Sequence, residues 1–346
     1  MMSRINQNNL MPERSRLFCP LESTNVEMFF SLVDYRNNYF ASDDPKRIIE
    51  FYNGFENRDQ LIQWMRERPK GVANIHEVNG DKDIIVVIPT ADFNGKYAKE
   101  CRGNIFKGIH IIFVESGGRG DFYFNLAHNI NVGIRKAMEY NLKWVVLSND
   151  DVNSSFNSDN LKSELSKINN KTTNMVLTKK GSQSSNKTSI CSFTPLGLLI
   201  YKFLNITKLY ALFKKLKNFH LETQISMNLG NRYFILRYGR NIFNIIRRRV
   251  YSFYNFEAFG IFSYIWLRDH PELFDETYIN AQEDQDLSIA LSKEPEKISW
   301  INYGIDGLGG GTMGINLQRA FRSVASDSYL NYKIERELLD KIPSSP

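Results

Sequence analysis

Three short apolar runs follow one another in the first half of the chain, and each is followed by polar residues. The runs are 84–88, 109–114 and 144–147. The first two are continuous and rich in β-branched residues, which is typical of strands buried on both faces of a sheet. Between the second and third runs, residues 124–140 repeat apolar side chains at a helical period. Strands that alternate with helices predict an α/β fold with a doubly wound sheet.

Helical patterns flank these strands. Residues 44–55 and 57–68 predict two helices; Asn57 is a capping residue for the second, and Pro69-Lys70-Gly71 ends it. Residues 153–187 are rich in Ser, Asn and Lys, and predict loops around one short helix. Residues 250–267 predict strands of the core, and helices are expected to begin near Glu283 and near Asn316.

Candidate chemistry follows the apolar runs. The first run is followed by Pro89-Thr90, the second by Glu115-Ser116 and the third by Ser148-Asn149-Asp150-Asp151. In open α/β sheets the carboxyl ends of the strands form the ligand site, so these loops are expected to converge. Carboxylates at such a position can hold Mg²⁺ together with the phosphates of a substrate. The alternative is an Asp-rich turn that only ends a strand.

A second carboxylate cluster lies downstream. Asp275-Glu276 is followed by Glu283-Asp284-Gln285-Asp286, which opens a helical pattern. Acidic residues in a first helical turn are favoured by the helix dipole, so they can be purely structural. The functional alternative is a general base at the mouth of a pocket. The triplet Gly309-Gly310-Gly311 before Thr312 can likewise be a flexible turn or a loop whose backbone faces a diphosphate.

Charge is concentrated in one segment of a chain that is only mildly basic overall. The 346 residues carry a net charge of +6, yet residues 196–250 contain eleven Lys or Arg and one acid, Glu222. Aromatic and aliphatic residues are interleaved with these bases, which is typical of surfaces that meet anionic membranes or acidic partners, including nucleic acid. Two ordinary helices with a solvated basic face would give the same pattern.

Compartment can be predicted from what the sequence lacks. Three scattered cysteines, no apolar leader and no apolar run of membrane-spanning length predict a cytoplasmic protein.

The order of these motifs resembles that of family 2 of the glycosyltransferases, the inverting enzymes with the GT-A fold, and most closely their rhamnosyltransferase-like branch. The resemblance covers residues 84–315. It rests on motifs in one order, namely Ile88-Pro89-Thr90, Glu115-Ser116, Asn131-Val132-Gly133, Ser148-Asn149-Asp150-Asp151, Phe274-Asp275-Glu276 and Glu283-Asp284-Gln285-Asp286-Leu287. The chain departs from the family where Ala91-Asp92 replaces Tyr-Asn, where Glu115 replaces Asp, and in the long basic segment.

The resemblance implies a role for each motif. Asp151 would bind Mg²⁺ or Mn²⁺, and Asp284 would be the catalytic base, with Glu283 as the second choice. The nucleotide-sugar donor would contact Pro89, Thr90, Glu115, Ser116, Asn131, Asn149 and Asp150, although Asn131 could instead pack its helix onto the sheet. The acceptor would be a glycan or a lipid-linked glycan in surface polysaccharide or glycoprotein synthesis, at the inner face of the membrane, with no nucleic acid expected.

The resulting domain scheme has five parts. They are a helical N-terminal extension (1–80), the nucleotide-sugar half of a Rossmann-like, mixed-sheet GT-A domain (81–195), a basic aromatic helical insertion (196–255), the acceptor half (256–315) and a C-terminal helical tail (316–346). Two other functions remain open: a sugar-nucleotide nucleotidyltransferase, and a non-catalytic basic module that binds membrane or nucleic acid. The first would need a glycine-rich basic loop after the first strand, which Thr90-Ala91-Asp92-Phe93 does not supply.

Overall fold

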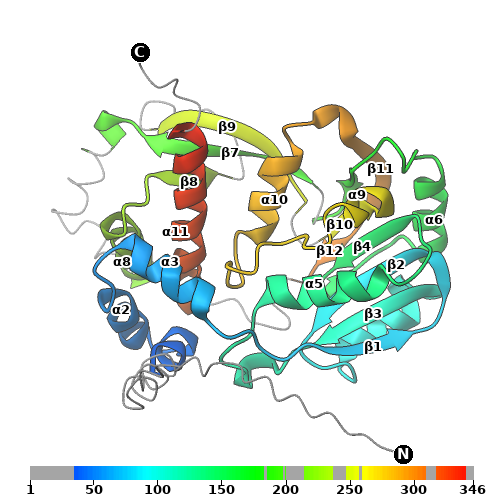
Figure 1. Ribbon diagram of the computed structural model, residues 1–346, viewed down its shortest axis with the longest axis horizontal. Coiled ribbons are helices and arrows are strands. Elements are labelled where there is room, and N and C mark those ends of the chain that lie inside the picture. The colour runs from blue at the N-terminus through cyan, green and yellow to red at the C-terminus, as the bar shows by residue number, and fades with distance from the viewer. Residues whose placement is uncertain are drawn as a thin grey trace, which may run out of the picture.

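The computed structural model describes residues 35–182, 185–197, 199, 214–236, 247–256, 259–308 and 317–339. Within these residues, the largest element is a seven-stranded sheet in the order β1-β3-β2-β4-β10-β6-β11 (Figure 1). Its strands are β1 (Asn74–Val78), β2 (Asp81–Thr90), β3 (Ile109–Glu115), β4 (Trp144–Ser148), β6 (Met175–Lys180), β10 (Phe259–Ser263) and β11 (Ile298–Gly304).

The sheet is mixed. β2 lies between β3 and β4 and pairs with both in parallel. β10 pairs antiparallel with β4 and with β6, and β11 continues from β6 in parallel. β1 closes the other side, antiparallel to β3. The predicted α/β fold with a mixed sheet is therefore present and is compatible with a Rossmann-like arrangement, and the three predicted strands are neighbours in the sheet.

Helices cover both faces of the sheet because the central strands are apolar on both sides. Ile84, Val86 and Ile88 face one core cluster, which includes residues of α4 (Lys96–Glu100), the π-helix Cys101–Ile105 and α6 (Ser158–Ser166). Ile85 and Val87 face the other, which includes residues of α5 (Leu126–Ala137) and α9 (Tyr264–Arg268). This alternation explains the continuous apolar run, as expected of a strand buried on both faces.

A second unit lies beside the sheet (Figure 1). It contains a three-stranded antiparallel sheet, β8-β7-β9, and helices that share one apolar core with it. The members are α2 (Pro45–Asn53), α3 (Arg58–Glu67), β7 (Asn186–Phe193), α8 (Lys214–Asn228), β8 (Tyr233–Leu236), β9 (Arg247–Asn255) and α11 (Leu317–Leu339). α10 (Glu283–Leu291) lies between this unit and the main sheet (Figure 1). The predicted helices 44–55 and 57–68 are confirmed as α2 and α3, and Asp44 and Asn57 cap them.

Two sequence predictions were wrong in part. Residues 153–187 contain the predicted helix α6, but they also contain β6 and the start of β7. The apolar stretch of β6 is only three residues long, and it becomes a strand through pairing with β10 and β11, which are remote in sequence. In the segment 196–255, expected to be helical, residues 233–236 and 247–255 are strands that pair with β7. The basic stretch extends beyond these strands and α8. Most of that remainder, including Lys202 and Arg240, is not among the described residues.

A short strand pairing lies just after β4. β5 (Val152–Asn153) pairs antiparallel with β12 (Asp306–Gly307). Two 3-10 turns, at Gly118–Gly120 and Pro295–Lys297, occur in loops. Across the described part of the chain, no helix is both long and apolar enough to cross a membrane.

Candidate functional site at the carboxyl ends of the strands

The carboxyl ends of β2, β3 and β4 meet, as the sequence predicts. The Thr90 hydroxyl donates to Asp150 Oδ2 at 2.6 Å, which joins the end of β2 to the loop after β4. The Ser116 amide donates to the Thr90 carbonyl at 2.9 Å, which joins the end of β3 to the same point. All three side chains are buried. Pro89, one residue earlier on β2, is half-buried.

Exposure alternates along the acidic turn after β4. Asn149 and Asp151 are half-buried, whereas Asp150 between them is only 5% exposed. The Cys101 thiol donates to the Asp150 carbonyl at 3.3 Å, and the Leu308 amide donates to the Asp151 carbonyl at 2.8 Å. Burial, and then the charge of Asp150, raises the pKa of Cys101 to about 12, so this thiol stays protonated. The turn is therefore held from both sides, and Asn149 and Asp151 are partly exposed to solvent.

The chain enters the Gly309-Gly310-Gly311 triplet immediately after Leu308. The triplet and Thr312 lie outside the described residues. The bond between Leu308 and Asp151 places Leu308, the last described residue before the triplet, at the acidic turn.

Glu115 holds protein groups with both of its oxygens. Oε1 accepts from the Phe93 amide at 2.9 Å, and Oε2 lies 2.9 Å from His76 Nε2. The His76 ring stacks on Phe93 with centroids 4.4 Å apart, and the Arg102 guanidinium lies 4.6 Å from the Phe93 centroid. Glu115 thus organises the loop after β2. His76 comes from β1, which lies outside the stretch that resembles the glycosyltransferases.

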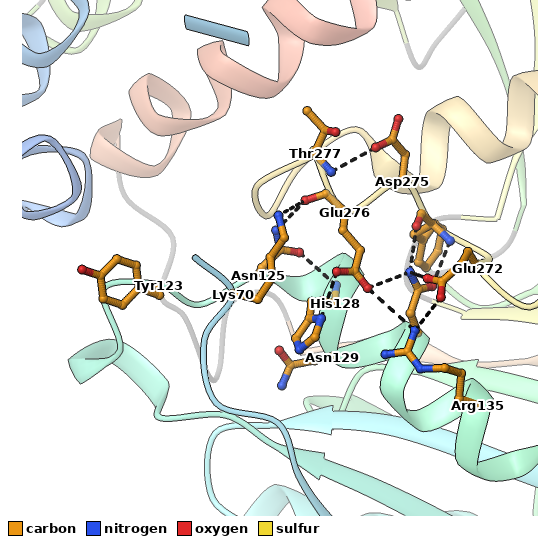
Figure 2. Close-up of polar contacts among 12 residues, drawn as sticks. Lys70, Tyr123, Asn125, His128, Asn129, Arg135, Glu272, Asp275, Glu276 and Thr277 are labelled. Atoms are coloured by element: carbon orange, nitrogen blue, oxygen red, sulfur yellow. Dashed lines mark hydrogen bonds and ion pairs between the residues drawn. The ribbon is translucent and has the colours of Figure 1, made fainter. Parts of the chain in front are cut away.

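The first part of the second carboxylate cluster, Asp275-Glu276, lies in a strongly constrained segment, residues 272–282. We call it the acceptor segment, after the half of the predicted domain scheme to which it belongs. Figure 2 shows how α5 and the chain after α3 surround Glu276. Glu276 Oε2 lies 2.9 Å from His128 Nδ1, and the Glu276 carbonyl accepts from Lys70 Nζ at 2.6 Å and from Asn125 Nδ2 at 2.9 Å. Arg135 forms an ion pair with Glu272 at 2.8 Å. The segment is therefore fixed at its middle by several donors.

Asn131 belongs to this network. Its Nδ2 donates to the Phe274 carbonyl at 2.8 Å and to Glu272 Oε2 at 3.0 Å, and its Oδ1 accepts from the Phe274 amide at 3.0 Å. The side chain is completely buried. Of the two roles open from the sequence, contact with the nucleotide sugar or helix packing, these contacts support a structural one. Asn131 attaches the acceptor segment to α5.

α11 holds the other side of the acceptor segment. Asp275 Oδ2 accepts from the Tyr329 hydroxyl at 2.7 Å and lies 3.3 Å from Lys333 Nζ. Burial raises the pKa of Asp275, but these bonds outweigh burial and the net pKa is lowered. Lys333 also pairs with Asp286, and Gln282 donates to Asp327. Asp286 therefore takes part in the packing of α10 on α11.

The acceptor segment leads directly into Glu283 and Asp284. Asn280 and Gln282 have φ of +59° and +71°, and they are the non-glycine residues with positive φ within the described ranges. Such backbone strain persists only where the surroundings enforce it, and it is common at functional sites. Asn280 Oδ1 accepts from the Leu126 amide at 3.0 Å, which ties this bend to the start of α5 and hence to the loop after β3.

Glu283 and Asp284 have different environments. Glu283 is 5% exposed, and its Oε2 has no hydrogen-bond partner among the described residues. Burial, and then the negative charge of Asp284, raises the pKa of Glu283 to about 8. Asp284 is half-buried. Neighbouring carboxyl groups in different environments are typical of acid–base sites.

Lys70, His76 and His128 were not identified from the sequence as parts of the site. A basic residue after a helix and a histidine on an amphipathic helix are common, so no local signal separates these residues from ordinary ones. Asn and Asp oxygens at the turn after β4 are hard ligands suited to Mg²⁺ or Mn²⁺. Within the described ranges, no group of three or more His, Cys, Asp or Glu comes together as a metal site.

Comparisons of the chain with protein-family models, with curated proteins and with solved structures find no match.

Proposed function

We propose that the protein is a metal-dependent inverting glycosyltransferase of family 2, with a GT-A fold, which moves a sugar from a nucleotide-sugar donor to a glycan or lipid-linked acceptor. The observation that carries the proposal is the convergence of Thr90, Ser116 and Asp150 from three parallel strands. This is the edge at which open α/β sheets bind nucleotides. The motifs that resemble the family are thereby brought to one place or tied to it.

In the donor half, Asp151 and Asn149 would supply oxygen ligands for Mg²⁺ or Mn²⁺, and the diphosphate would supply others. Bound there, the metal would offset the charge that develops on the departing nucleoside diphosphate. Thr90 would hold Asp150 in place, while Pro89 and Ser116 would line the nucleoside pocket. Glu115 would shape that pocket through Phe93 and His76, because both of its oxygens are engaged by these residues.

In the acceptor half, Asp284 would take the proton of the acceptor hydroxyl. The hydroxyl oxygen would form a bond to the anomeric carbon while the bond from that carbon to the diphosphate oxygen breaks, which inverts the configuration. Below pH 8 Glu283 would remain protonated beside Asp284. Since a protonated carboxyl group cannot take up the hydroxyl proton, Asp284 rather than Glu283 would be the base.

The proposal is tested by replacing Asp151 with Asn. Purified wild-type protein is screened with nucleotide sugars and Mn²⁺ or Mg²⁺ for release of nucleoside diphosphate. The Asp151→Asn variant should lose at least about 100-fold in kcat, since electrostatic stabilisation of a leaving group is worth this much or more. Asp159→Asn changes an exposed carboxylate in the first turn of α6 and should leave kcat unchanged.

Two results would contradict the proposal. One is the absence of metal-dependent turnover with every nucleotide sugar tested. The other is turnover that Asp151→Asn and Asp159→Asn reduce equally.

A further inference from the structure

The five residues 68–72, which we call the strap, connect α3 to the main sheet and contact several of the elements around the acceptor segment. The sequence marks this stretch only as the end of a helix. In the structure, its residues contact the turn 121–124 and α5. Lys70 donates to the Glu276 carbonyl (Figure 2). The strap packs closely against the turn, since a Cβ on Gly71 would lie 2.2 Å from Asp121 Oδ2 and 2.9 Å from the Phe124 amide nitrogen.

Arg68 fixes the first end of the strap. The side chain is 4% exposed, and its guanidinium donates to the carbonyls of Phe122, Tyr123 and Phe124. Its Nε donates to Asn37 Oδ1 at 2.6 Å. Burial lowers the pKa of Arg68 to about 10, which still leaves it charged at neutral pH. A buried cation with several acceptors binds the N-terminal helices rigidly to the loop after β3.

The second end of the strap is fixed by α5 and the turn. The Val72 amide donates to Asp121 Oδ2 at 2.9 Å, and the Val72 carbonyl accepts from Asn129 Nδ2 at 3.1 Å. Between these two anchors, the half-buried Lys70 is held in place to donate to the Glu276 carbonyl. Glu276 lies seven residues before Glu283 in a segment that is constrained throughout.

We propose that Lys70 is a positioning residue for the Glu283–Asp284 pair, and that the strap couples the position of this pair to that of α2 and α3. This inference rests on the proposed function for the identity of the reaction, but the mechanical link can be measured without turnover. The Glu276 carbonyl also accepts from Asn125. Loss of the lysine ammonium would therefore loosen the acceptor segment without leaving that carbonyl unpaired.

The test compares Lys70→Met with Lys70→Arg and with the control Lys162→Met. Lys162 is also half-buried and pairs with Asp81 at 2.9 Å at the opposite end of β2. For Lys70→Met we expect a fall in kcat of about tenfold or more, since small displacements of a catalytic group cost up to about 100-fold. The affinity for nucleoside diphosphate with Mn²⁺ and the melting temperature should match those of Lys162→Met. Lys70→Arg, which keeps a cationic donor, should recover most of the activity.

Hydrogen exchange provides the measurement that does not need a substrate. Amides of residues 276–283 should exchange faster in Lys70→Met than in Lys162→Met, while those of α2 and α3 should not. The inference is overturned if exchange in 276–283 is unchanged. It is also overturned if kcat, nucleotide affinity and melting temperature all fall together, because that pattern indicates a general loss of structure. If the wild type turns over no nucleotide sugar, the proposed function fails while the exchange result still decides the role of Lys70.

Discussion

At the residue scale, two buried threonines differ in what their hydroxyl groups contact. The Thr90 hydroxyl bonds to Asp150, whereas the Thr178 hydroxyl is buried with no hydrogen-bond partner among the described residues. Thr90→Val leaves a buried carboxylate oxygen with one donor fewer and should lower the free energy of unfolding by about 1–3 kcal/mol. Thr178→Val should leave it unchanged or raise it slightly. Denaturant unfolding of both variants measures the difference, and equal effects would show that the Thr90 bond contributes nothing.

Glu283 makes the stability of the protein depend on pH. Its pKa is about 8 when folded, compared with an ordinary value of 4.5, so the folded state holds the extra proton between these values. The contribution of Glu283 to the free energy of unfolding is full below pH 4.5 and is lost as the pH rises through 8. Glu283→Gln should remove this loss. Between pH 5 and pH 8.5, the wild type should lose on the order of 4 kcal/mol more unfolding free energy than the variant.

Chemical denaturation at the two pH values checks this expectation. Asp327 and Glu222, whose pKa values burial raises to about 6 and about 7, remain in both proteins and cancel in the comparison. Identical pH dependence in wild type and variant would show that Glu283 is ionised at neutral pH.

The positions of single residues were predicted from sequence only where a motif places them at a strand end. Thr90, Ser116 and Asp150 were expected to meet, and they do, because parallel strands carry their carboxyl ends to one edge. Asn131 and Glu115 were expected near a nucleotide, but their polar atoms hold other protein groups. A sequence motif specifies the residue type, whereas its hydrogen-bond partners come from segments that only the fold brings close.

At the scale of elements, α5 determines how closely the helical layer approaches the sheet. A Cβ on Gly133 would lie 2.4 Å from Val87 Cγ1 and 2.9 Å from Val114 Cγ2. Gly133→Ala should therefore cost about 1–3 kcal/mol of unfolding free energy through overpacking. A Cβ on Gly103 in the π-helix would meet open space within 4 Å, so Gly103→Ala should be neutral or slightly stabilising. Thermal or denaturant unfolding separates the two, and a neutral Gly133→Ala would mean that α5 can shift outward.

Elements with a long, uniform pattern were predicted correctly, whereas β6, β8 and β9 were not. Apart from Thr90 and His110, the buried residues of β2 and β3 are apolar, and α5 repeats at a helical period, so each carries its own signal. β6 has only Met175, Val176 and Leu177 as an apolar stretch, and its strand conformation depends on β10 and β11. The basic, aromatic sequence around β8 and β9 also suits a helix. Pairing with β7 determines that these residues form strands.

For the whole molecule, the main correction concerns the N-terminal region. The sequence indicates a helical lead-in without visible chemistry. In the structure, α2 and α3 share a core with α11, and the strap connects them to the acceptor segment. Such contacts join segments far apart in the chain, so local patterns of hydrophobic residues could not predict them.

The packing of α2 and α3 against α11 has a consequence for how the chain is made. The Tyr52 hydroxyl on α2 accepts from the Ala325 amide at 3.0 Å and donates to the Phe321 carbonyl at 2.7 Å, across a separation of about 270 residues. During synthesis, α2 and α3 leave the ribosome long before α11 has been made. Their shared core therefore stays incomplete until α11 is present. The central sheet can form in the meantime, whereas the N-terminal helices are exposed to chaperones and proteases until the last helix has been translated.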